Sequence, residues 1–198
     1  MAGIDLVLAS GSPRRRELFE SLGWPFRVSV PSIDEGLNPG EGAAEACGRL
    51  AREKARATAL LFPGAWVVAA DTLVSVEGVI LGKPASREES LGMIRRLQGR
   101  AHSVFTGVAL CAGGRTEWAV EETTVVFRPL SEADMAAYVA SGEGDDKAGA
   151  YAIQGLGSLV VSSICGDYFN VVGLPLCRLG RLFEALGRPL ADQWRIAE

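Results

Sequence analysis

Two short glycine turns constrain the fold of this chain most strongly, because each reverses the direction of the backbone between two strand-like segments. LVSVEGVIL, at 73–81, turns back at Glu77-Gly78, and a Gly-Gly pair joins the two long strand-like segments at about 102–112 and 116–127. A turn this short joins antiparallel strands, whereas parallel strands need a long crossover. Segments with helical spacing lie between the other strands. The sequence therefore predicts a mixed α/β domain with one central sheet flanked by helices.

The remaining elements are indicated by apolar spacing and by caps. Ser86 and Ser131 have the side chains expected at helix N-caps, and Glu89 completes a capping-box pattern with Ser86. Pro13 suits the first turn of a helix. We expect strands at 4–9, 26–30, 65–71 and 158–164, and helices at 13–22, 43–61, 86–97, 131–140 and along Leu179, Leu182, Phe183 and Leu186.

Length and charge limit the classes of function. The chain has 198 residues, so we expect residues 1–198 to form a single domain, with two lobes. Apolar residues make up 48% of the chain and charged residues 22%, which is a globular profile. The net charge of −4 argues against a nucleic-acid polymer as partner, because such proteins carry basic surfaces. A small anionic ligand stays open, since local charge can oppose net charge.

The first ten residues and the cysteines bear on location. MAGIDLVLAS holds no cationic leader and only a short apolar run, so we expect neither a secretory signal nor a membrane span. Cys47, Cys111, Cys165 and Cys177 lie far apart, without a CxxC pair. We expect four buried thiols, with no disulfide framework and no zinc site. These features favour a cytoplasmic protein.

An anion site is indicated where the first strand meets the first helix, in LASGSPRRREL at 7–17. Ser10 and Ser12 offer hydroxyls and backbone N–H groups at the positive end of the helix. Arg14 and Arg15 add forked donors that suit phosphate. The stretch lacks the GxxxxGK[ST] frame of a Walker loop. From these residues alone, a capped surface helix with solvated arginines is an equally good interpretation.

Asp71 and the three lysines are further candidates. Asp71 ends the apolar segment AWVVAAD, and α/β sheets place ligands at the carboxyl ends of buried strands. Asp also caps turns, which is its more common role without other acids nearby. The chain has only three lysines, Lys54, Lys83 and Lys147, but 17 arginines. Where arginine is the usual cation, a lysine indicates a site that needs a point charge rather than a fork of donors. A GC-rich genome explains the same scarcity of lysine.

Two polar residues remain. Gln154 stands alone between Ile153 and a glycine, and its amide can read the edge of a base. A turn glutamine that faces water is the alternative. His102, the only histidine, falls in a predicted strand, where a structural role is more usual than a catalytic one.

Taken together, seven segments resemble the Maf family of nucleoside triphosphate pyrophosphatases, in the family's order and over about residues 4–187. They are LASGSPRRRELFESLG, SIDE, REKA, AADTLVSVEGVILGKP, LQGRAHSVFTG, DKAGAYAIQG and GDYFNVVGLP. The resemblance implies a two-lobed mixed α/β fold related to the inosine-triphosphate pyrophosphatases. It also implies hydrolysis of a nucleoside triphosphate to monophosphate and pyrophosphate, assisted by a divalent cation, Mg²⁺ or Mn²⁺.

The resemblance assigns roles to residues that match the family's motifs. Asp71 is the implied proton acceptor, with Lys83 and Glu35 as further catalytic residues. Glu35 and Asp71 are the implied metal ligands. The implied phosphate-binding residues are Ser10, Ser12, Arg15 and Lys54.

Three positions separate the branches of the family. Arg14, Thr72 and Gln154 agree with the branch active on dTTP and UTP, whereas the branch acting on 7-methyl-GTP resembles it but has Trp at the first position. CTP and modified pyrimidine nucleotides stay open as substrates. Phe169, in GDYFN, departs from the family pattern, where a small polar residue is more usual, and this bears on local loop packing.

Other functions remain open beside this one. They are a house-cleaning pyrophosphatase for other modified nucleotides, a nucleotide sensor without turnover, and a regulator of cell division, since the family's name comes from a septum-inhibition phenotype. Release of pyrophosphate from a panel of nucleotides separates them. Exposed apolar surface on a two-lobed domain also favours a homodimer.

Overall fold

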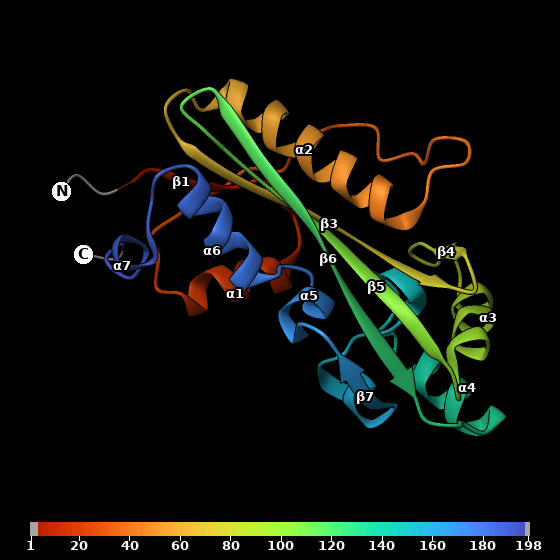
Figure 1. Ribbon diagram of the computed structural model, residues 1–198. Coiled ribbons are helices and arrows are strands. Elements are labelled where there is room, and N and C mark those ends of the chain that lie inside the picture. The colour runs from red at the N-terminus through yellow and green to blue at the C-terminus, as the bar shows by residue number, and fades with distance from the viewer. Residues whose placement is uncertain (1–3, 197–198) are drawn as a thin grey trace.

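Three long strands run the length of the molecule in the computed structural model, which describes residues 4–196 (Figure 1). They are β3 (Trp66–Val76), β5 (Ala101–Ala112) and β6 (Arg115–Phe127), and each is antiparallel to the next. Gly113 and Gly114, between β5 and β6, have φ angles of 56° and 76°. A two-residue hairpin turn of type I′ requires positive φ at both positions, which glycine adopts without strain, so the glycines explain this turn.

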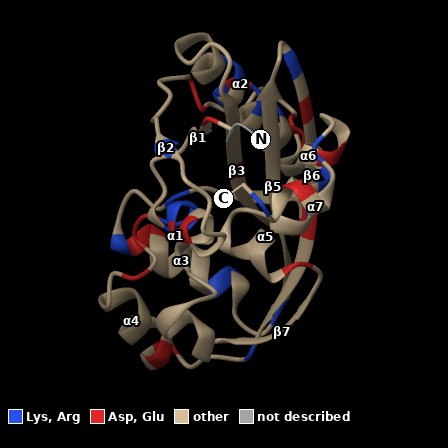
Figure 2. Cartoon of the chain, turned by 90° about the vertical axis from the view of Figure 1, so that its left-hand side faces the viewer, with Lys and Arg blue, Asp and Glu red and all other residues tan. Residues whose placement is uncertain are grey.

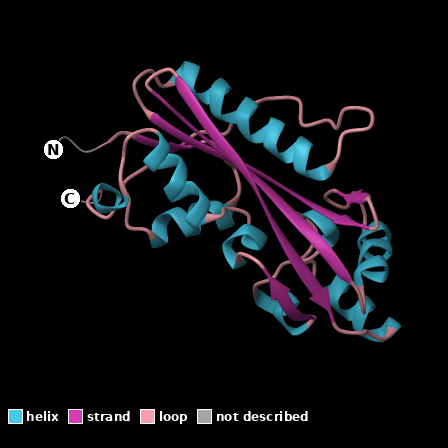
Figure 3. Cartoon of the chain, viewed as in Figure 1, coloured by secondary structure: helices cyan, strands magenta, loops and turns pink. Residues whose placement is uncertain are grey.

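Four shorter strands complete the sheet. β1 (Leu6–Leu8) runs parallel to β2 (Arg27–Val28) and to β3. β4 (Val79–Leu81) and β7 (Val161–Cys165) are antiparallel to their neighbours. The order is β2-β1-β3-β5-β6-β7, with β4 beside β3. The prediction of one mixed sheet flanked by helices is confirmed (Figure 3).

Helix α2 (Ala43–Leu61) lies along one face of the sheet, with the bounds that the sequence predicted. Small side chains let it approach closely. An added Cβ on Gly107 would lie 2.1 Å from the backbone oxygen of Cys47. This contact with β5 fixes the position of α2 and of the lysine that it carries, Lys54.

The other helices form two groups, and each group has its own apolar core. α1 (Pro13–Ser21), α5 (Tyr168–Val172) and α6 (Leu176–Ala185) belong to one end of the molecule. α3 (Arg87–Leu97) and α4 (Glu132–Ala140) belong to the other. The two separate cores correspond to the two predicted lobes. A short helix, α7 (Leu190–Gln193), and the 3₁₀ turns Ala148–Ala150 and Gly155–Leu159 complete the elements.

One strand prediction was wrong in a way that matters for function. The sequence predicted a strand that ends at Asp71, but β3 continues to Val76. Residues 72–75 go on pairing with β5, residue by residue, from Thr72 opposite Thr106 to Ser75 opposite Ser103. Asp71 therefore lies in the middle of a strand, and the argument from a strand end does not hold for it.

Smaller differences have local causes. The strand expected at 158–164 begins only at Val161, after a 3₁₀ turn, and strands 4–9 and 26–30 are shorter than predicted. The Glu89 side chain accepts a hydrogen bond from the backbone N–H of Ala85, not from that of Ser86 as a capping box requires. The other bond of the predicted cap forms, because the Ser86 hydroxyl accepts from the backbone N–H of Glu89. Helices α5 and α7 are too short to leave a periodic pattern.

The cysteine prediction was wrong for two of the four residues. All four are free, but only Cys47 and Cys111 are buried, whereas Cys165 and Cys177 are exposed. Cys165 lies on β7, an edge strand of the sheet. Within residues 4–196, the structure has no helix with the length and apolar character that a bilayer crossing needs.

Candidate active site

A cavity of about 540 Å³ opens beside the middle of β3. On one side of this strand, β1 pairs with residues 66–68 and β4 with residues 74–76, while β5 pairs along the other side. Residues 69–73 therefore have one open edge. Side chains from both faces of the sheet reach the cavity there, including Asp71 and Thr72.

All ten residues to which the resemblance assigns a role line this one cavity. The lining holds five cationic side chains and three acidic ones, although the whole chain carries a net charge of −4. Acidic and basic residues are interspersed elsewhere on the chain (Figure 2). All three lysines belong to the lining. The ten predicted residues are Ser10, Ser12, Arg14, Arg15, Glu35, Lys54, Asp71, Thr72, Lys83 and Gln154.

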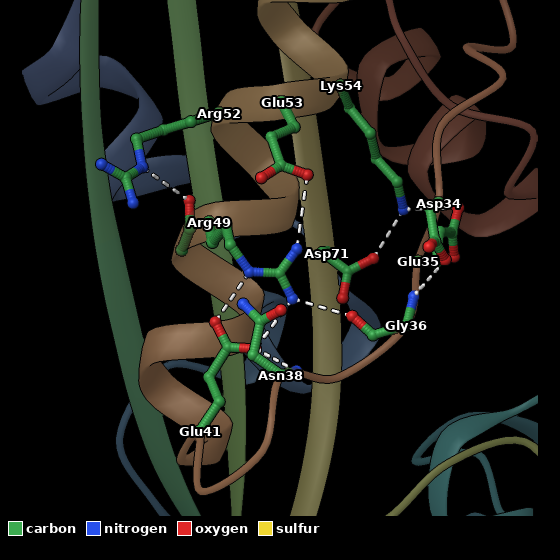
Figure 4. Close-up of polar contacts among 11 residues, drawn as sticks. Asp34, Glu35, Gly36, Asn38, Glu41, Arg49, Arg52, Glu53, Lys54 and Asp71 are labelled. Atoms are coloured by element: carbon green, nitrogen blue, oxygen red, sulfur yellow. Dashed lines mark hydrogen bonds and ion pairs between the residues drawn. The ribbon is translucent and has the colours of Figure 1, made fainter.

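Lys54 joins two carboxylates at the cavity wall (Figure 4). Its Nζ lies 2.6 Å from Asp71 Oδ1 and 2.9 Å from Glu35 Oε1. The side chains of Lys54 and Asp71 are only 8% and 11% exposed, whereas that of Glu35 is 55% exposed. The pairing offsets the cost of burying the Lys54 and Asp71 charges. No described residue donates to the second oxygen of Asp71, which leaves that oxygen free to receive a ligand.

The Arg15 guanidinium is held by three oxygens. Its Nε donates to the Gly173 carbonyl at 2.7 Å, its Nη2 to Thr72 Oγ1 at 2.9 Å, and its Nη1 to Ser10 Oγ at 3.3 Å. Burial lowers the pKa of Arg15 from its usual value, and the charge of Asp71 opposes this shift. An arginine pKa begins far above neutrality, so the group stays cationic.

A chain of hydroxyls supports Arg15 from behind. Thr72 Oγ1 lies 2.9 Å from Thr106 Oγ1, and Thr106 donates to the Asn170 carbonyl at 2.9 Å. Because a carbonyl only accepts, Thr106 uses its one hydrogen there and accepts the hydrogen of Thr72. Thr72 thus receives a hydrogen bond from Arg15 and has no hydrogen left for a ligand.

The serines predicted for anion binding lie at the start of α1. Ser12 is the N-cap residue, and its side chain makes no capping bond. Its backbone N–H instead donates to Ser10 Oγ at 3.2 Å. The Ser12 hydroxyl and the positive end of the helix are therefore available to an anion.

A second cavity of about 280 Å³ shares Arg14, Gln154 and Lys147 with the first. Glu143 holds its wall, because its carboxylate accepts at 2.8 Å from the N–H groups of both Leu156 and Gly157. These bonds fix the turn that follows Gln154. Arg14 and Gln154 therefore belong to one end of the site, apart from the Lys54 cluster.

Three participants have no role among those that the resemblance assigns. Lys147 also lines the cavity, and its scarcity as a lysine was the signal that pointed to it. Gly173 contributes a backbone carbonyl and Thr106 a hydroxyl behind the cavity wall. Contributions of these two kinds leave no pattern in a single sequence.

The resemblance implies a divalent cation, and the donor set fits one. Mg²⁺ is usually held by one or two carboxylates together with phosphate oxygens and water. Glu35 and Asp71 supply two carboxylates around one ammonium group. No group of three or more acidic, histidine or cysteine ligands occurs in the described part of the chain. These donors suit an ion that arrives with phosphates better than one enclosed by protein alone.

The fold and the site define a mixed α/β protein with a cationic cleft of the size usual for small ligands. A family model described as Maf-like protein matches residues 5–186, and the chain belongs to this family.

Several relatives are named dTTP/UTP pyrophosphatase. The protein of Symbiobacterium thermophilum is 51% identical, over 94% of this chain and 96% of its own length. The protein of Myxococcus xanthus is 53% identical, over 96% of this chain and 95% of its own length. The protein of Thermus thermophilus is 48% identical, over 92% of this chain and 95% of its own length.

Two solved structures show a more distant likeness. The Staphylococcus aureus Ham1 protein is 17% identical with a TM-score of 0.47, and covers 79% of each chain. A nucleoside-triphosphatase, or dITP/XTP pyrophosphatase, of Mycobacterium abscessus is 15% identical with a TM-score of 0.44, over 93% of this chain and 99% of that one. Both are too distant to bear on the site.

Proposed function

We propose that this chain hydrolyses dTTP and UTP to the nucleoside monophosphate and pyrophosphate. The names of relatives that match nearly the whole chain support this substrate class. The observation that carries the proposal is the Lys54 ammonium, which holds Asp71 and Glu35 at the wall of a cavity that Arg15 and Lys83 also line.

The chain's own groups have distinct parts in this reaction. Asp71 accepts a proton from the water that attacks the α-phosphorus, through the oxygen that Lys54 does not occupy. Arg15, Lys54 and Lys83 offset the charge that develops on the phosphates. A divalent cation held by Glu35 and Asp71 would acidify water and neutralise phosphate charge.

Base choice belongs to the other end of the site. The Gln154 amide has one acceptor and a donor pair, which match O4 and N3–H of thymine or uracil. A flipped amide also matches cytosine, so CTP and modified pyrimidine nucleotides stay within the proposal. Arg14 borders the same cavity as Gln154. Thr72, the third position that separates the branches, supports Arg15 in this proposal and does not itself select the base.

Three broader statements belong to the same proposal. Residues 1–198 form one domain, which is supported by three long strands that extend through both lobes. A homodimer and a cytoplasmic location remain predictions of the sequence. Sedimentation of the purified chain tests the homodimer directly.

Product analysis tests the reaction. The purified chain with Mg²⁺ or Mn²⁺ is expected to release pyrophosphate from dTTP and UTP faster than from GTP or 7-methyl-GTP, and excess EDTA is expected to stop it. Release of inorganic phosphate and nucleoside diphosphate would contradict attack at the α-phosphorus. Tight binding without turnover would instead indicate a sensor.

Asp71→Asn tests the proton acceptor. The amide keeps the size of the side chain but accepts no proton, so we expect the rate to fall by about 10²–10⁴. Circular dichroism and a thermal melt check that the variant is folded. A variant that keeps more than about a tenth of the rate would place the base elsewhere, with Glu35 the first candidate.

A further inference from the structure

Glu35 lies in a long segment that forms no helix or strand, residues 29–42. Within the described structure, two side chains outside this segment make hydrogen bonds or ion pairs with residues 30–41, and both belong to α2. Lys54 contacts the Glu35 carboxylate itself. Arg49 contacts the part of the loop that follows it, at Gly36 and Glu41 (Figure 4).

Arg49 makes the more extensive contact. Its Nε and Nη2 each lie 2.7 Å from an oxygen of Glu41, and the same Nη2 donates to the Gly36 carbonyl at 2.9 Å. Glu41 also accepts from the backbone N–H of Asn38 at 3.0 Å. One guanidinium thus joins the residue after Glu35 to the far end of the loop. Only the planar fork of arginine offers donors in this arrangement.

Burial decides which of the two contacts holds the loop. The side chains of Arg49 and Glu41 are 19% and 4% exposed, whereas that of Glu35 is 55% exposed. A pair with an exposed partner is weakened by water and salt, and a shielded bidentate pair is weakened less. Hydrogen bonds from Arg49 also lower the pKa of Glu41 to about 2, so the pair stays ionised at any ordinary assay pH.

We propose that Arg49 and Glu41 form a clamp that positions Glu35 toward Asp71 and the divalent cation. The clamp touches neither substrate nor reacting atoms, so these are positioning residues. The inference rests on the metal-binding role given to Glu35 in the proposed function. Groups that orient metal ligands from behind typically change metal affinity about 10–100-fold when they are lost.

Two mild substitutions test the clamp in the full-length chain. Arg49→Lys keeps the charge but loses the fork, and Glu41→Gln keeps the shape but loses the charge. Mn²⁺ affinity is measured from the electron paramagnetic resonance signal of free Mn²⁺, with saturating α,β-imido-dUTP, which resists cleavage at the α–β bridge. Steady-state kinetics with dTTP are measured in parallel.

We expect both variants to bind Mn²⁺ about 10-fold more weakly, with an unchanged KM for dTTP and a kcat that recovers at high Mn²⁺. A merely structural defect would lower kcat at every Mn²⁺ concentration. Arg52→Lys is the matched control, because Arg52 lies on the same helix but donates to Gly48 O and stacks over Trp118. Its Mn²⁺ affinity is expected to match the wild type.

Glu35→Gln separates this inference from the proposed function. If Glu35→Gln weakens Mn²⁺ binding and the clamp variants do not, the clamp is wrong and the metal role of Glu35 stands. If Glu35→Gln leaves Mn²⁺ binding unchanged, the metal role itself is wrong, and the clamp falls with it. Weaker Mn²⁺ binding in the two clamp variants and in Glu35→Gln, with Arg52→Lys unaffected, supports both the clamp and the metal role of Glu35.

Discussion

The hydroxyl hydrogen of Thr72 points toward Thr106, because Thr106 gives its own hydrogen to the Asn170 carbonyl. Thr106 and Asn170 are fully buried, so no water replaces these partners. Thr72 therefore has no hydrogen to donate to a ligand, and its oxygen instead accepts a hydrogen bond from Arg15. At the residue scale, the direction of one hydrogen bond distinguishes a residue that contacts a base from one that supports Arg15, the proposed phosphate ligand.

Thr72→Val tests this distinction by removing the hydroxyl at nearly constant shape. A lost hydrogen bond to a charged group corresponds to a decrease of about 10-fold or more in kcat/KM. We expect a similar decrease for dTTP, UTP, CTP and GTP. Gln154→Ala, in contrast, is expected to narrow the preference for pyrimidines. A selective loss in Thr72→Val would show that Thr72 contacts the base.

His102 gives a prediction about pH. Its Nε2 lies 2.7 Å from the Tyr151 hydroxyl, and burial lowers its pKa to about 4. The unfolded histidine titrates near pH 6.5, so between these values the unfolded chain binds a proton that the folded chain does not. The contribution to stability is therefore complete above pH 6.5 and decreases as the pH falls toward 4, by up to about 3 kcal/mol.

Urea unfolding at several pH values between 4.5 and 7.5 measures this effect. His102→Gln keeps a polar group beside Tyr151 but does not titrate, so its free energy of unfolding should depend less on pH than that of the wild type. Equal pH dependence in both proteins would assign the acid sensitivity to other groups.

At the scale of elements, the contact between α2 and the sheet determines where Lys54 lies. α2 presents Ala51 and Ala55 to the sheet, and β5 presents Gly107 beneath the backbone of Cys47. Because the obstacle at Gly107 is backbone, no side-chain rotation can relieve an added methyl group. A shift of α2 away from β5 would therefore also move Lys54.

Gly107→Ala is expected to lower both stability and activity. Overpacking of this kind costs about 1–3 kcal/mol, and a backbone obstacle favours the upper end of that range. Gly92→Ala is the matched control, since Gly92 lies inside α3 with nothing within 4 Å of an added Cβ. That variant should gain about 0.5–1 kcal/mol, because alanine favours the helix. Denaturant midpoints and kcat measure both, and an unaffected Gly107→Ala would mean that α2 shifts without consequence.

At the scale of the whole molecule, β3, β5 and β6 belong to both lobes. The core beside α6 and the core beside α3 each contain residues of β3 and β5. Neither lobe can lose its core without disturbing strands on which the other depends. The cleft is consequently built on one continuous sheet.

This architecture predicts one cooperative unfolding transition. Calorimetric and van't Hoff enthalpies should agree, and fluorescence and circular dichroism should report the same midpoint. The addition of a bound nucleotide should raise that midpoint without dividing the transition. Two resolved transitions would show that the lobes unfold separately.

Local patterns in the sequence determined much of this structure. Helical spacing predicted α2 with its correct bounds. The Gly-Gly pair predicted the β5–β6 hairpin, and both glycines have positive φ in the structure. Motifs also identified ten residues that all line one cavity. These features depend on neighbours in the chain, or on short strings that carry their chemistry with them.

Only the tertiary structure decided how these parts form a site. Asp71 reaches the cavity because β1 and β4 leave the middle of β3 unpaired on one side, not because a strand ends there. The Arg15–Thr72–Thr106 chain and the carbonyl of Gly173 connect segments up to 158 residues apart. Strand pairing and buried hydrogen bonds between distant segments depend on which surfaces meet after folding, so periodicity and spacing along the chain carry no record of them.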